Sequence, residues 1–311
     1  MFASRQAFSQ LRHRLRAGAC ILVIGSLQTS AALSASCPAT VGHCPTQGCS
    51  TSSSPFAAFD PLLNQQKNRP DGPAVPKNPP FTVADTMDEA QLPVHIAVPP
   101  NGKDLRSTWN QTPKFKQISK FEARQATVEG YVVHAKAGGA ESCNCDIKTS
   151  TALDTHINLV DKPSDPNVDP ATLPGVSLIA EITWRVRKTH ADWTVANLKQ
   201  LDLTHTGARV RLTGDLLYDN VHSDMINKHQ RGTLWEIHPI RRIQVFVKNK
   251  WVDFSAAKTT LAKNAAPAGN GPMAMAPGAA AAGTDITNAF KPRWTPAQLQ
   301  KLEQAFGEDR S

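Results

Sequence analysis

Two pairs, each formed by an acidic residue and a histidine two positions apart, have the clearest capacity for chemistry in this chain. Asp154 and His156 form the first pair, and Glu236 and His238 form the second. A carboxylate and an imidazole on the same side of a rigid element can bind a metal, transfer a proton or orient a ligand. These four residues therefore define the first candidate site.

Both pairs lie in segments with the composition and alternation of β-strands. Residues two apart on a strand point to the same side of the sheet. Glu236 and His238 therefore share one face, and the apolar Trp235 and Ile237 share the other. Asp154 and His156 likewise share one face of their predicted strand.

Two interpretations of these pairs stay open from the sequence. If the two strands bring Asp154, His156, Glu236 and His238 together, two imidazoles and two carboxylates would form a site for Zn²⁺ or Mn²⁺. The simpler interpretation is a structural latch, in which each histidine hydrogen-bonds to a nearby acid or to the backbone. Glu181 and His222 are further candidate ligands of the metal.

Residues 118–255 supply the elements that must position these side chains. Five segments are rich in β-branched and aliphatic residues, and a helix at 191–201 separates the third from the fourth. This is the element order of the OB-fold, a five-stranded Greek-key barrel. We predict a mainly β protein with an OB-fold-like barrel; an SH3-like barrel or small sandwich is the alternative. The predicted strands are residues 126–135, 154–160, 176–183, 209–218 and 233–247.

The flanking regions differ from this domain in composition. Residues 1–36 combine a basic start, a short apolar run and small residues, the layout of a secretory signal peptide. Residues 37–117 are rich in Pro, Ser and Asn and are predicted to be mostly disordered. An Ala/Gly/Pro linker is expected at 256–293, followed by a short amphipathic helix at 294–308.

The cysteines indicate export to an oxidising compartment, either periplasmic or extracellular. The chain has 6 cysteines, and removal of the signal peptide with Cys20 leaves an odd number. Cys143 and Cys145 are too close in sequence to pair without strain. We therefore expect a disulfide between their loop and the N-terminal segment, with one thiol left over.

Basic residues predict a second candidate surface. The chain has 34 Lys and Arg against 26 Asp and Glu, a net charge of +8. Trp184 lies next to arginines in the sequence, as on protein surfaces where aromatic rings stack on bases and basic residues neutralise phosphates. The alternative is a solvated strand edge that discourages aggregation. The sequence has no phosphate-binding glycine loop, serine-nucleophile elbow or dinucleotide fingerprint. The candidate ligand-binding residues are Trp184, Arg185, Arg187, Arg241 and Arg242.

The segments 214–222 and 232–240 resemble a pattern in uncharacterised secreted bacterial proteins. In that pattern a glycine-led strand ends near an Asp and a His, and a Trp-Glu-Ile-His-Pro strand follows. Residues 154–159 are similar to the second strand of the same group. The resemblance implies an OB-fold-like domain without an assigned activity. The element order is also similar to staphylococcal-nuclease-type OB domains, whose catalytic Arg and acidic pattern does not occur here.

These features lead to three hypotheses of function. The leading one is an exported, non-catalytic binding module for an anionic or polymeric ligand, such as nucleic acid, a glycan or an envelope component. The second is a metal-dependent hydrolase, for example a phosphodiesterase, in which a metal-bound water is the nucleophile. The third is an envelope-associated scaffold that makes its contacts through the tails and the terminal helix. No transmembrane span is expected in the mature chain, and the sequence leaves the oligomeric state undetermined.

Overall fold

We analysed a computed structural model of the protein. It describes residues 36–51, 58–77, 79–88, 91–92, 102–122, 124–162, 170–202, 206–264 and 295–307. The predicted signal peptide, apart from Ser36, and most of the predicted linker lie outside these ranges. Statements about structure below concern the described residues.

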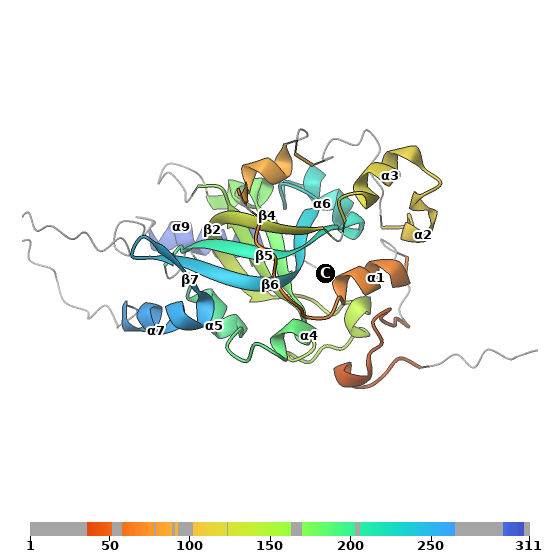
Figure 1. Ribbon diagram of the computed structural model, residues 1–311, viewed down its shortest axis with the longest axis horizontal. Helices are drawn as coiled ribbons and strands as arrows, with labels where there is room; N and C mark the ends of the chain where they lie inside the picture. Colours follow the sequence, from red (N-terminus) through yellow and green to blue (C-terminus); the bar gives the residue numbers. More distant parts are fainter. Residues whose placement is uncertain are drawn as a thin grey trace, which may run out of the picture. The chain divides into compact units, whose positions relative to one another are not determined.

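A closed barrel of five strands forms the centre of the described structure (Figure 1). Strand β2 pairs antiparallel with β3 and with β5, and β3 pairs antiparallel with β4. The barrel closes because β6 pairs parallel with β4 and antiparallel with β5. The predicted strands and OB-fold order are therefore confirmed. Their bounds are β2 (Gln125–Ala137), β3 (Thr155–Val160), β4 (Leu178–Ile182), β5 (Arg209–Tyr218) and β6 (Trp235–Val247).

Aliphatic side chains from all five strands fill the barrel interior, including Val132, Ile157, Ala180, Leu212 and Ile243. Burial of such side chains is the main favourable contribution to folding.

Two glycines allow close approaches between neighbouring strands. A Cβ atom added at Gly214 would lie 2.3 Å from the carbonyl oxygen of Pro239, and one added at Gly130 would lie 2.7 Å from Cγ2 of Val83. The register of β5 against β6 shifts beside Gly214. Both positions are therefore places where a larger residue would clash.

Two short helices replace the single helix predicted at 191–201. They are α4 (Trp184–Arg187) and α5 (Val195–Lys199). Thr194 has an extended backbone, and its hydroxyl accepts a hydrogen bond from the backbone N–H of Asn197. This N-cap makes α5 begin at Val195, four residues later than the apolar pattern indicated.

The segment 37–117, predicted to be mostly disordered, contains several ordered elements in its described residues. A disulfide joins Cys44 to Cys145 beside the barrel, and a second one joins Cys37 to Cys49. These links restrict a segment whose composition alone offers little apolar burial. The elements are η1 (Val41–His43), α1 (Pro61–Lys67), β1 (Phe81–Thr82), η2 (Ala84–Met87), α2 (Arg106–Trp109) and α3 (Pro113–Ser119).

The disulfide from Cys145 to the N-terminal segment confirms the predicted type of link, and Cys143 is the free, buried thiol. Further short elements are η3 (Ser142–Asn144), η4 (Pro170–Thr172), η5 (Pro174–Val176), η6 (Asn220–His222), α6 (Ser223–Asn227) and β7 (Lys250–Asp253).

Among the described residues, the helices α7 (Phe254–Asn264) and α9 (Pro296–Gly307) follow the barrel strands. Leu302 and Phe306 of α9 pack with Val133, Val160 and Leu173, so this helix docks on its own domain. Within the described ranges, none of the helices combines the length and apolar character needed to cross a membrane.

Candidate metal centre

The barrel brings the two acid–histidine pairs together. Asp154 directly precedes β3, His156 lies on β3, and the second pair lies on β6. Strand β4 runs between them and contributes Glu181, which is the register partner of His156. The parallel pairing of β4 with β6 places Glu236 opposite Ile179, two residues before Glu181. Glu181 is therefore the carboxylate between the two pairs.

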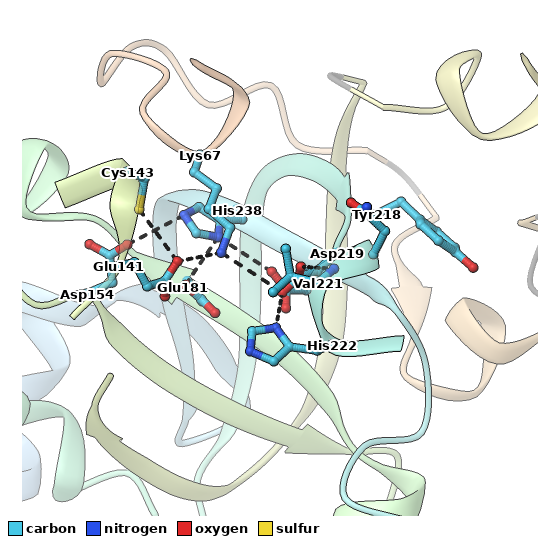
Figure 2. Close-up of polar contacts among 12 residues, drawn as sticks. Lys67, Glu141, Cys143, Asp154, Glu181, Tyr218, Asp219, Val221, His222 and His238 are labelled. Carbon is cyan, nitrogen blue, oxygen red and sulfur yellow. Dashed lines mark hydrogen bonds and ion pairs between the residues drawn. The ribbon is translucent and has the colours of Figure 1, made fainter. Parts of the chain in front are cut away.

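His238 lies between carboxylates from three strand segments (Figure 2). Its Nδ1 atom is 3.2 Å from Oε2 of Glu181 and 3.5 Å from Oε2 of Glu236, and its Nε2 atom is 3.8 Å from Oδ2 of Asp154. One ligand atom from each of Asp154, Glu181 and His238 lies within 4.8 Å of the other two. Such a set can hold a metal ion.

His156 forms a second set on the other side of Glu181. Its Nε2 atom is 3.3 Å from Oε1 of Glu181 and 4.0 Å from Oε1 of Glu141. Glu141 comes from the loop after β2. A Cβ atom added at Gly138 would lie 2.5 Å from Nε2 of His156, so this loop passes close to the imidazole.

A third group contains Asp219, His222 and Glu236, and Arg231 contacts two of its carboxylates. Nδ1 of His222 lies 2.5 Å from Oδ2 of Asp219. Arg231 Nη2 donates to Oε1 of Glu236 at 2.6 Å, and its Nη1 lies 3.6 Å from Oδ2 of Asp219.

Lys67 connects the second and third groups. Its Nζ donates to Oε2 of Glu141 at 2.6 Å and lies 4.0 Å from Oδ2 of Asp219 (Figure 2). We call the whole set the buried charged cluster: Lys67, Glu141, Asp154, His156, Glu181, Asp219, His222, Arg231, Glu236 and His238.

Four members of this cluster were not among the predicted ligands: Lys67, Glu141, Asp219 and Arg231. Lys67 lies on α1, in a segment predicted to be disordered, and Glu141 lies in a loop held by the Cys44–Cys145 disulfide. Arg231 precedes β6 and has no periodic relation to Glu236. The one signal in the sequence that could have indicated Arg231 as a partner of Glu236 was its place a few residues before Glu236 and His238.

Several ligand atoms of the cluster are buried without a hydrogen bond from the described residues. These atoms are Oδ2 of Asp154, Oε2 of Glu181, and both ring nitrogens of His238. The three residues are 0 %, 1 % and 0 % exposed, respectively. Buried polar groups in native proteins nearly always have a partner. A cation between these side chains would satisfy them.

The charges of the cluster also favour a cation. Five carboxylates face only two permanently charged side chains, Lys67 and Arg231. Burial raises the pKa of Glu181 well above its ordinary value, and the neighbouring Glu236 and Glu141 raise it further. Burial also raises the pKa of Asp154. A divalent ion between these two carboxyls would favour their ionised forms and lower their pKa.

The carboxylates beside a cation behave in the opposite way. Burial raises the pKa of Glu141, but Lys67 and His156 lower it more, to about 2. Burial likewise raises the pKa of Asp219, yet His222 and Lys67 bring it well below its ordinary value. The cluster therefore divides into carboxyls whose pKa a neighbouring cation lowers and carboxyls whose pKa burial raises.

A cavity of about 320 Å³ reaches one edge of the cluster. It is lined on that side by Lys67, Glu141 and His222, and farther out by Asp60, Asn64 and Ser142. The Asp154, Glu181 and His238 set lies deeper, outside this lining.

The arginines predicted to bind an anionic ligand contact the chain itself. Trp184 stacks against Arg185, whose guanidinium carbon lies 4.6 Å from the ring centre. Arg241 and Arg242 contact different strands, through Asp215 of β5 and Asp253 of β7. The acceptors are Asn68 and the Cys44 carbonyl for Arg185, Thr155 and the Thr151 carbonyl for Arg187, Asp215 and the Pro70 carbonyl for Arg241, and Asp253 for Arg242.

Fold and site thus define a closed OB-fold-like barrel with a buried carboxylate–imidazole centre. No protein-family model, curated protein or solved structure matches the chain.

Proposed function

We propose that this protein is an exported OB-fold-like barrel that binds a divalent cation through Asp154, Glu181 and His238. The observation that carries the proposal is the convergence of their ligand atoms within 4.8 Å, in a buried place where these atoms lack hydrogen bonds. Mixed carboxylate and imidazole ligands suit Zn²⁺ and Mn²⁺.

The latch interpretation fits one residue of the second pair better than the other. Glu236 accepts a 2.6 Å hydrogen bond from Arg231, so it already has a structural partner. His238 makes no hydrogen bond with the described residues through either ring nitrogen. Oε2 of Glu236, like Oε2 of Glu181, has no hydrogen bond from the described residues, but it is Glu181 whose ligand atom lies within 4.8 Å of those of Asp154 and His238. This grouping supports Glu181 as the carboxylate ligand from the centre of the cluster.

Hydrolysis is the activity that the surroundings of this centre favour. The cavity beside Glu141 and His222 can admit a small substrate to the edge of the cluster. A bound divalent ion supplies a water of lowered pKa and a positive charge for the substrate. The binding-module hypothesis has less support, because its predicted arginines donate to acceptors of the chain itself.

Export is supported by the two disulfides, since such links persist mainly in oxidising compartments. It also agrees with the signal-peptide layout of residues 1–36.

Two conservative variants test the metal site. Glu181→Gln and Asp154→Asn keep the shape of the carboxyls and remove their buried negative charge, so both variants should fold without metal. Zn²⁺ and Mn²⁺ should bind the chelator-treated wild type in calorimetric titrations and stabilise it by about 2.7 kcal/mol at a concentration 100 times Kd. Glu181→Gln should lose this binding, Asp154→Asn should lose the ion held with His238, and the control His190→Gln, outside the cluster, should keep the binding.

Equal metal binding by the wild type and Glu181→Gln would overturn the assignment. Hydrolysis is tested separately with bis-p-nitrophenyl phosphate and metal-loaded protein. Turnover that disappears in Glu181→Gln supports the hydrolase. A metal-loaded protein without turnover would count against phosphodiester hydrolysis and leave the metal site standing.

A further inference from the structure

We infer that the centre holds two divalent cations bridged by Glu181, with Glu141 and His156 as the other ligands of the second ion. This inference rests on the proposed metal site, which supplies the first ion through Asp154 and His238.

The two oxygens of Glu181 face different histidines. Oε2 lies 3.2 Å from Nδ1 of His238, and Oε1 lies 3.3 Å from Nε2 of His156. The carboxylate is 1 % exposed, and Oε2 has no hydrogen-bond partner among the described residues. A carboxylate with an imidazole at each oxygen has the arrangement needed to bridge two ions, which lie about 3.5–4 Å apart in two-metal sites.

Glu141 can contribute to the second position without releasing Lys67. Its Oε2 atom accepts from Nζ of Lys67 at 2.6 Å, while its Oε1 atom faces Nε2 of His156 at 4.0 Å. Ligand atoms of Glu141, His156 and Glu181 lie within 4.8 Å of one another. The second position therefore has its own imidazole and carboxylate in addition to the shared one.

The third group is less suited to a cation. Arg231 lies 3.6 Å from Asp219 and 2.6 Å from Glu236. Its guanidinium already pairs with the two carboxylates and would repel a metal ion. The second ion is therefore assigned beside His156.

The second position also defines the class of ligand. Glu141 lines the cavity of about 320 Å³, so the second ion would lie on the cavity side of the centre. With the carboxylates ionised, one divalent ion leaves the cluster without a net positive charge, whether or not His222 is protonated. A second ion makes it positive. The doubly loaded centre should therefore bind an anion from the cavity, such as a phosphate group.

Metal stoichiometry tests the inference on the full mature chain. Chelator-treated protein is loaded with Mn²⁺, desalted and analysed for bound metal. Two ions per chain are expected for the wild type and for the control His190→Gln, one for His156→Gln and none for Glu181→Gln. Two bridged Mn²⁺ ions should also show magnetic coupling in electron paramagnetic resonance, and His156→Gln should show an isolated ion.

The possible failures separate the two proposals. One ion in the wild type overturns the second site and leaves the proposed metal site intact, whereas no ion overturns both. Two ions in His156→Gln would place the second one elsewhere and overturn the assignment.

Should His156→Gln fail to fold, Lys67→Met/Glu141→Gln removes an ion pair as a unit and should also retain one ion. Calorimetric titration with inorganic phosphate should detect binding to the doubly loaded wild type and none to the singly loaded variant. Absence of phosphate binding by both would overturn the assignment of the anionic ligand.

Discussion

Two histidines of the described structure, the buried His134 and the half-buried His222, have pKa values shifted in opposite directions. His134 lies on β2 and stacks on Phe306 of α9, with ring centres 5.4 Å apart. Burial lowers its pKa to about 4. Burial also disfavours the charged form of His222, but the carboxylate of Asp219 outweighs this effect and raises the pKa of His222. The partner of a buried imidazole, more than its burial, decides whether it carries charge.

The surroundings of the two histidines differ in the same way, because His134 lies in an apolar contact and His222 lies in the buried charged cluster. The contact of α9 with the barrel is largely apolar, through Leu302, Phe306 and their neighbours. The buried charged cluster contains many ionisable groups and depends on pairing each charge. Substitutions that leave a charge unpaired should therefore lower the free energy of unfolding far more in the cluster than elsewhere.

The largest effect is expected from Arg231→Met. This change removes the guanidinium beside Glu236 and Asp219 and leaves buried carboxylates with one fewer cation. Breaking a buried ion pair in this way costs about 3–5 kcal/mol. Denaturant unfolding of metal-free protein measures the loss. A decrease below about 1 kcal/mol would show that the cluster does not depend on Arg231.

Acid should weaken the α9 side of the barrel through His134. Because its folded pKa is lowered to about 4, the stability from neutral His134 is present above the unfolded pKa of about 6.5. That stability should fall by about 3 kcal/mol as pH decreases from about 6.5 to 4. His134→Phe keeps a ring against Phe306 and removes the titration.

The measurement is the unfolding free energy of wild type and His134→Phe at several pH values. Nearby Asp202, Lys136 and Lys199 are present in both proteins, so the difference isolates His134. Parallel acid profiles for the two proteins would contradict the prediction.

Removal of the Asp219 carboxylate should shift the pKa of His222 in the same direction as that of His134, which is downward. In Asp219→Asn the imidazole loses the carboxylate that raises its pKa, which should lower that pKa. NMR titration of the ring protons detects this change, with His190 as an internal reference outside the cluster. An unchanged His222 titration would show that Asp219 does not set its charge.

The smallest effect is expected at an exposed ion pair. Arg242 and Asp253 are 37 % and 59 % exposed in their side chains, although their closest atoms lie 2.8 Å apart. Exposed pairs contribute about 0–1 kcal/mol. Arg242→Ala should therefore change the unfolding free energy by less than about 1 kcal/mol. A loss as large as that of Arg231→Met would contradict the contrast between exposed and buried pairs.

Local patterns were sufficient to predict the barrel, because strand alternation and turn residues are properties of short segments. They also placed Asp154, His156, Glu236 and His238 on strand faces. Lys67 and Glu141 were missed because their positions depend on a disulfide and on packing between distant segments. The helix predicted at 191–201 differs from the helix in the structure, which begins at Val195, because the Thr194 N-cap outweighed the apolar spacing.

The central claim is that Asp154, Glu181 and His238 bind a divalent cation. The most direct test is anomalous X-ray diffraction from crystals of the mature protein loaded with Zn²⁺ or Mn²⁺. We predict an anomalous peak about 2.0–2.2 Å from an oxygen of Glu181 and a nitrogen of His238. Metal-loaded crystals with peaks only at the molecular surface, and with none between these side chains, would contradict the claim.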